Sequence, residues 1–69
     1  MNADEIGKII KERRKMLGVD QKALSELSGV AVHTLSDLES GKGNPTISVL
    51  NMITHVLGMD VVVKVQDDT

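Results

Sequence analysis

The side chains in this chain that are best suited to metal or catalytic chemistry are two histidines, His33 and His55. A protein metal site needs three or four ligands at suitable spacing, and two histidines without any cysteine do not supply such a set. No serine, histidine and carboxylate are arranged as in a nucleophilic site, and no glycine-rich phosphate loop of the Walker type occurs. We therefore expect no metal, no cofactor and no enzymatic activity.

The polar side chains of residues 20–44 favour hydrogen bonding to another molecule over metal binding or catalysis. Asp20 is a suitable N-cap for a helix that reaches about Ser28, and Gly29 follows where a tight turn needs a positive φ. A further helix is predicted from Val32 to about Ser40. The order helix, glycine turn, helix is the layout of the DNA-binding helix-turn-helix, although the layout alone is a weak indication.

The flanking elements must hold this unit in place. Residues 4–17 predict a first helix that ends at Gly18, and Thr46 is a suitable N-cap for a last helix that ends at Leu57 before Gly58. The apolar stripe of the first helix consists of Ile6, Ile9, Ile10, Met16 and Leu17, and the two middle helices contribute Ala23, Leu24, Leu27, Leu35 and Leu38. The last helix carries two stripes, Ile47, Leu50, Ile53 and Leu57, and beside it Val49, Met52 and Val56. Two stripes are more than one small core needs.

Residues 59–66 differ in character from the rest of the chain. Residues 60–66 read DVVVKVQ, and such a run of β-branched residues predicts a strand. A single strand cannot satisfy its own backbone hydrogen bonds, and the sequence predicts no second strand. The same strand of a second copy is the simplest partner. The expected fold is therefore all-α, with a four-helix domain over residues 4–58 and a dimerisation strand over residues 59–66 that pairs across a dimer.

Composition leads to the same expectation of a partner chain. A chain of 69 residues forms one domain that buries only about 60% of its surface, and without cysteine it has no disulfide to stabilise it. The absence of aromatic residues excludes the stacking platforms of single-strand and RNA binders. No apolar run approaches a membrane span, and the first residues do not resemble a signal peptide, so a cytoplasmic location is expected. The net charge of −2 counts against indiscriminate nucleic-acid binding, although basic residues cluster in the first helix.

Three segments of the sequence resemble the Cro/Xre-type helix-turn-helix repressors. Residues 20–30 read DQKALSELSGV, which is similar to the second helix and turn of that family, and residues 34–42 read TLSDLESGK, which is similar to its recognition helix. The run Asn44-Pro45-Thr46 with Leu50 and Leu57-Gly58 matches the fourth helix. The resemblance covers about residues 5–59 and implies a lambda-repressor-like fold.

The resemblance also implies roles for individual side chains. The base-contacting positions of the recognition helix are Val32, His33, Ser36 and Asp37. A histidine can donate to guanine, an aspartate can accept from cytosine N4, and a valine can contact a thymine methyl group. The expected phosphate contacts are Gln21, Thr34, Ser40, Lys42 and Asn44. The alternative is a solvated polar face followed by a mobile loop, and Asp37 is the least suitable member because phosphate repels it.

Two further positions bear on the recognition helix. Arg14 and Glu39 match a pair that forms an internal salt bridge in this family, the alternative being two unconnected surface charges. Ala31 departs from the family pattern, which commonly has a capping serine there, and Asp20 departs from the more usual threonine. Both departures argue against very tight DNA binding.

The tail resembles that of HipB-type antitoxins, whose C-terminal strands pair across the dimer. This likeness implies an operator-binding homodimer that represses its own operon and binds a HipA-like kinase toxin. The expected dimer interface comprises Val49, Met52 and Val56 with Val61, Val63 and Val65, or the opposite parity of the tail, unless these residues belong to the core of one chain. The alternative function is a protein-interaction module of the same fold that neutralises a partner without binding DNA.

Overall fold

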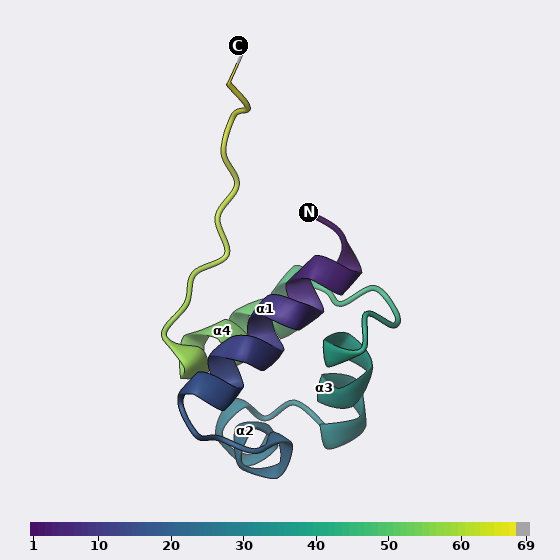
Figure 1. The fold of residues 1–69 in the computed structure, drawn as a ribbon, viewed down its shortest axis with the longest axis vertical. Helices are drawn as coiled ribbons and strands as arrows, with labels where there is room; N and C mark the ends of the chain where they lie inside the picture. Colours follow the sequence, from purple (N-terminus) through teal and green to yellow (C-terminus); the bar gives the residue numbers. More distant parts are fainter. Residues whose placement is uncertain (68–69) are drawn as a thin grey trace.

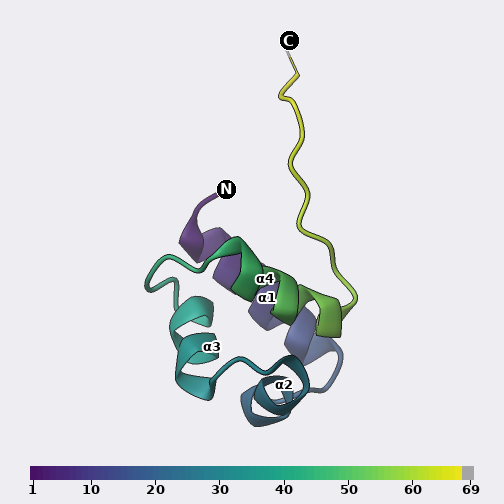
Figure 2. The same cartoon turned by 180° about the vertical axis from the view of Figure 1, so that it is seen from behind.

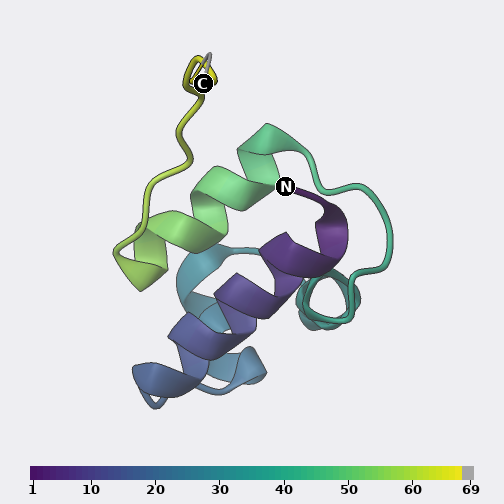
Figure 3. The ribbon, with the colours of Figure 1, turned by 45° about the horizontal axis from the view of Figure 1, so that its top comes forward.

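The computed structural model describes residues 1–67, and these contain four helices and no strand. The helices are α1 (Ala3–Met16), α2 (Gln21–Ser28), α3 (Val32–Glu39) and α4 (Ile47–Leu57), as labelled in Figure 1. The prediction of a four-helix, all-α domain is confirmed, with boundaries within one or two residues of those expected. Figures 2 and 3 show α1 and α4 running in the same general direction above α2, with α3 to one side.

Local chemistry explains where three of the helices begin. The side chains of Asn2, Asp20 and Thr46 each accept a hydrogen bond from the backbone N–H three residues later, as N-cap residues do. Two helices end at a glycine with positive φ, Gly29 after α2 and Gly58 after α4, which is the backbone conformation that a side chain disfavours. The cap of α1 by Asn2 was not anticipated from the sequence.

The core lies where the four helices meet. Its buried apolar side chains are Ile10, Leu24, Val30, Leu35, Leu38, Leu50, Ile53 and Leu57. The helix α1 packs against α3, and α2 packs against both α3 and α4. The approach of α1 to α3 is so close that a Cβ atom at Gly7 would overlap the carbonyl oxygen of Leu38. Backbone contact with α1, as well as side-chain packing, therefore holds α3 in place.

Several apolar residues predicted to face the core are exposed instead. Of the stripe on α1, only Ile10 is fully buried, and on α2 the side chain of Leu27 is 66% exposed. Helices this short touch their neighbours over a narrow strip, so that only about one apolar residue per turn reaches the core. The exposed members of the predicted stripes are Ile9, Met16, Leu17, Leu27 and Ile47.

The predicted strand over residues 59–66 is not formed in the single chain. Residues 59–67 have no regular secondary structure, and they extend away from the helices as an open segment (Figure 1). A strand requires ladder hydrogen bonds to a neighbouring strand, and the described residues of one chain offer none. Val63 and Val65 are 93% and 91% exposed, so this segment has the apolar surface of a strand without its partner.

Candidate nucleic-acid interface

The segment from α2 to α3 forms a compact turn. Gly29 adopts φ 78° and its N–H donates to the carbonyl of Ser25, which ends α2. The next residue, Val30, is buried in the core, and its N–H donates to the hydroxyl of Ser28 at 3.2 Å. Two residues later α3 begins. Burial of Val30 therefore anchors the turn in the core, and this fixes the direction in which α3 continues from the turn.

The outer face of α3 carries the four side chains predicted to contact bases. Val32, His33 and Asp37 are exposed and Ser36 is half-buried, whereas Leu35 and Leu38 on the opposite face are buried. Positions i, i+1, i+4 and i+5 lie on one side of a helix, so these four side chains form one continuous surface. This surface combines a donor, an acceptor, a hydroxyl and an apolar contact, the groups that distinguish base edges in a major groove.

A buried ion pair connects α1 to the end of α3. The guanidinium of Arg14 donates to both carboxylate oxygens of Glu39, from Nε to Oε2 at 2.7 Å and from Nη2 to Oε1 at 2.8 Å. Its Nη1 donates to the carbonyl of Val19 at 2.8 Å, which ties the same side chain to the loop before α2. Gln21 completes the cluster by donating from Nε2 to Oε1 of Glu39 at 3.2 Å.

Both charges of this pair are stabilised. The hydrogen bond to Glu39 raises the pKa of Arg14 against the opposing effect of burial, and the attraction of Glu39 and Asp20 adds to it. Burial alone would raise the pKa of Glu39, but the hydrogen bonds from Arg14 and Gln21, together with the positive charges of Arg14 and Lys11, hold it below its ordinary value.

The lowered pKa of Glu39 predicts a loss of stability in acid. A carboxyl group whose pKa is lower in the folded state stabilises the fold above its unfolded pKa, and this contribution disappears as the pH falls toward the folded value. We expect the contribution of Glu39 to the free energy of unfolding to be complete above about pH 5. This contribution should decline as the pH falls below the ordinary glutamate pKa of about 4.3. Urea titrations followed by circular dichroism at several pH values measure this, and a variant with Arg14→Met and Glu39→Leu should lose that part of the acid dependence. An unchanged pH profile in the double variant would contradict the assignment.

The five residues predicted to contact phosphate differ in whether they have a hydrogen-bond donor free for that contact. Gln21 is half-buried and has one amide proton directed to Glu39, which leaves its second proton for another acceptor. Ser40 donates its only hydroxyl proton to the carbonyl of Ser36 at 2.9 Å, so in this arrangement it has none left for a phosphate oxygen. Thr34 is half-buried on α3. Lys42 and Asn44 are exposed in the loop after α3, where the N–H of Lys42 donates to the carbonyl of Asp37.

The start of α3 has no side-chain cap. Ala31 occupies the N-cap position with an extended backbone, and no side chain accepts a hydrogen bond there. Ala31→Ser should supply the missing acceptor and raise the free energy of unfolding by about 1 kcal/mol. This corresponds to an increase in Tm of about 4–8 °C for a domain of this size, measured by thermal melting at 222 nm. Ala31→Val, which adds no acceptor and is as poor an N-cap residue as alanine, is the control, and an equal gain in both variants would argue against capping.

The six residues predicted to form a dimer interface fall into two groups. Val49 and Val56 are half-buried and pack against the core of their own chain, so they belong in part to the monomer. Met52 is 41% exposed on α4. The members from the tail, Val61, Val63 and Val65, are 38%, 93% and 91% exposed.

One of the basic residues of α1, Arg13, has a structural role. Arg13 donates from Nε to the carbonyl of Leu57 at 2.9 Å, across 44 positions of sequence. This carbonyl is one of the unpaired acceptors at the end of α4, and an arginine there also complements the helix dipole. Arg13 therefore fixes the point from which the tail leaves α4. Nothing in the spacing of the sequence indicates so distant a contact.

Among residues 1–67, no group of three histidines, cysteines or carboxylates is placed to hold a metal ion. Within the same part of the chain, no helix has both the length and the apolar character needed to cross a bilayer.

Comparison with known proteins agrees with this geometry. Residues 10–63 match a family model described as helix-turn-helix (HTH_3). A protein of Methanothermobacter thermautotrophicus, named an uncharacterized HTH-type transcriptional regulator, is 36% identical over 52 residues, and the aligned region covers 75% of each chain. The matched residues include α2, the turn, α3 and the whole of α4.

Proposed function

Because the chain belongs to the helix-turn-helix family, we propose that it is a sequence-specific transcriptional repressor that binds operator DNA as a homodimer. The family and the relative named as a transcriptional regulator support a DNA-binding regulator of transcription. The observation that carries the proposal is the exposed face of α3, whose polar side chains lie opposite a buried face of leucines. The protein acts by binding and not by catalysis.

The recognition helix α3 enters the major groove with its N-terminal residues foremost. His33 and Ser36 donate to base edges, Asp37 accepts from cytosine, and Val32 contacts a thymine methyl group. Gln21 donates one amide proton to phosphate from the start of α2, while its other amide proton stays hydrogen-bonded to Glu39 at the end of α3. The same side chain therefore contacts both the phosphate and α3. Lys42 adds a positive charge beside the groove.

The homodimer places two copies of α3 on successive major grooves of an inverted repeat. Two half-sites about one helical turn apart, or 34–36 Å, fit a symmetric dimer of this kind. The exposed valines of the tail support dimerisation, because an apolar segment of this kind left in solvent promotes aggregation. The tails pair as strands across the dimer in this proposal.

The finer role is that of an antitoxin of a HipBA-like operon that represses its own promoter and binds a HipA-like kinase. The likeness of the valine tail to HipB-type tails supports this role. Co-purification of a kinase encoded by the adjacent gene would test it, and a neighbouring gene of another class would argue against it.

A gel-shift titration against the chain's own promoter tests the DNA-binding proposal. We expect a shift at lower protein concentration than with a random duplex of equal length at about 50 mM salt. His33→Ala should weaken specific binding by about 5- to 150-fold, since a good base contact contributes about 1–3 kcal/mol. Lys42→Ala should weaken binding to both duplexes alike and reduce the salt slope by about one. Lys8→Ala, on the exposed face of α1, is the matched control.

Equal affinity for promoter and random duplex would overturn the proposal. The second candidate, a protein-interaction module without DNA binding, is favoured by the uncapped start of α3 and by the exposed carboxylate of Asp37. Under that alternative, substitution of His33 or Asp37 would leave every DNA measurement unchanged while the dimer stays intact.

A further inference from the structure

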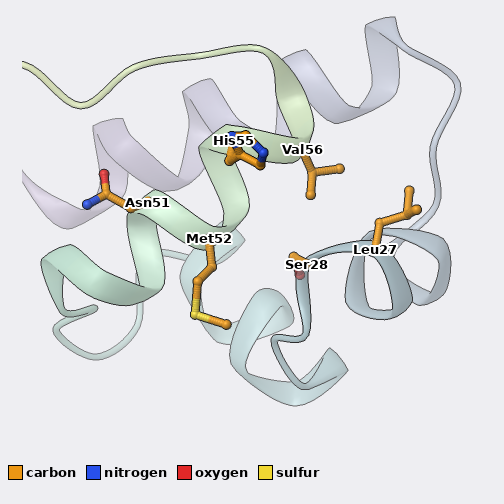
Figure 4. A pocket seen from close by; sticks show the side chains of 6 residues that line it. All are labelled: Leu27, Ser28, Asn51, Met52, His55 and Val56. Atoms are coloured by element: carbon orange, nitrogen blue, oxygen red, sulfur yellow. The ribbon is translucent and has the colours of Figure 1, made fainter.

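A shallow groove of about 450 Å³ lies between α2 and α4, outside the DNA-binding face (Figure 4). Met52 and Val56 point into it from α4, and Leu27 and Ser28 border it from α2. Its six lining residues include no aspartate, glutamate, lysine or arginine. Leu27 is 66% and Met52 41% exposed, so the groove presents apolar surface that the single chain does not cover.

We propose that the valine tail of a second copy, residues 61–65, docks in this groove, and that the exchange is reciprocal. This inference rests on the homodimer of the proposed function, but it replaces the pairing of the two tails as strands by contact of each tail with the partner's groove. Each chain then contributes both a groove and a tail, which gives a closed twofold dimer.

The chemistry of the two surfaces matches. The tail segment VVVKV carries a single charge, and an extended segment can direct alternate side chains into a groove while Lys64 points to solvent. Val63 and Val65 are almost completely exposed in the single chain, so their burial would remove the most apolar surface from water and contribute most to the free energy of docking. A nucleic acid or a strongly charged peptide would find no countercharge among the lining residues.

The chain's own tail does not cover its own groove. It leaves the end of α4 on the side away from α2, while the groove faces α2 (Figures 1 and 4). Val61 instead lies beside Asn51 and His55, on the neighbouring surface of α4. The groove is therefore left open to the tail of another copy.

The size of a stable interface favours reciprocal exchange. A standard interface takes about 20–30 residues from each partner, far more than the six that line the groove. A chain that offers its groove and its tail together contributes about twice as many residues as one that offers the groove alone. The two surfaces are also continuous, because Asn51 and His55 border both the groove and the root of the tail.

The groove touches the turn that positions the recognition helix. A Cβ atom at Gly29 would lie 3.5 Å from the terminal methyl group of Met52, so a tail that packs on Met52 also supports the turn between α2 and α3.

Cysteine cross-linking tests the exchange directly, because the chain contains no natural cysteine. Two differently tagged proteins, Met52→Cys and Val63→Cys, are mixed and oxidised. We expect a disulfide between them, which requires the two Cα atoms to approach within about 7 Å. Lys8→Cys in place of Met52→Cys is the control and should give none.

The outcomes separate this inference from the proposed function. A dimer by sedimentation that forms only Val63→Cys to Val63→Cys links would leave the homodimer standing and overturn docking in the groove. A disulfide within one chain carrying both substitutions would show that the tail docks on its own chain, and would also overturn the exchange. A monomer at high concentration would overturn both proposals, and DNA binding is measured independently.

A charge in the groove provides a second measurement. Met52→Glu, at an exposed position, should raise the dimer dissociation constant by about tenfold or more, because docking would desolvate the carboxylate. Lys8→Glu adds the same charge change elsewhere and should leave the constant unchanged. An unchanged constant in Met52→Glu would contradict docking there.

Discussion

Replacing Arg14 by alanine should lower the free energy of unfolding by about 3–5 kcal/mol, the cost of leaving a buried carboxylate without its partner. Arg14 is 8% exposed and Glu39 9%, so neither group regains full hydration when the other is removed. The substitution also removes the hydrogen bond to the carbonyl of Val19. A domain of this size has a total stability of about 5 kcal/mol, so the variant should retain only about 0–2 kcal/mol and be marginally folded at best.

Urea denaturation followed by circular dichroism at 222 nm measures this loss, since the chain has no aromatic residue to serve as a fluorescent probe. Lys15→Ala, an exposed substitution on α1, should change stability by less than about 0.5 kcal/mol. The double variant Arg14→Met with Glu39→Leu should recover most of the loss, because apolar residues replace both charges. If the double variant is no more stable than Arg14→Ala alone, the loss does not come from an unpaired charge.

Replacing Gly7 by alanine should destabilise the fold by about 3 kcal/mol, although the same change in an exposed helix stabilises by about 1 kcal/mol. The new Cβ atom would overlap the carbonyl oxygen of Leu38 and lie 3.1 Å and 3.3 Å from the carbonyl carbons of Leu38 and Glu39. These are backbone atoms of α3, which cannot rotate out of the way, so α1 and α3 would have to separate.

Separation of these helices would also strain the Arg14–Glu39 pair, since that pair joins the same two elements. Thermal melting measures the effect on stability, and a gel shift on the folded fraction should show weaker DNA binding because α3 is displaced. Lys8→Ala is the control on the exposed face of α1. A rise in Tm for Gly7→Ala would mean that α1 and α3 are not in backbone contact.

The helices themselves follow from local sequence. Asp20 and Thr46 are capping residues, Gly29 and Gly58 are stop residues, and each acts within a few positions of itself. Such interactions depend on short segments of chain, which is why four helices were predicted with nearly correct ends. The face of α3 that points outward also follows from the 3.6-residue period once Leu35 and Leu38 are placed inward.

Which apolar residues remain outside the core, and which distant groups meet, depends on how the helices pack. The periodicity gives Leu24 and Leu27 the same apolar side of α2, yet the first is fully buried and the second 66% exposed, because α4 covers only part of that side. Arg13 reaches Leu57 across 44 positions, and no spacing rule encodes such a contact. The helices, their ends and the apolar character of the tail could be predicted from the sequence, since these depend on neighbouring residues. The packing of one helix on another determined the exposed groove and the anchor of the tail, because both arise where segments far apart in the chain meet.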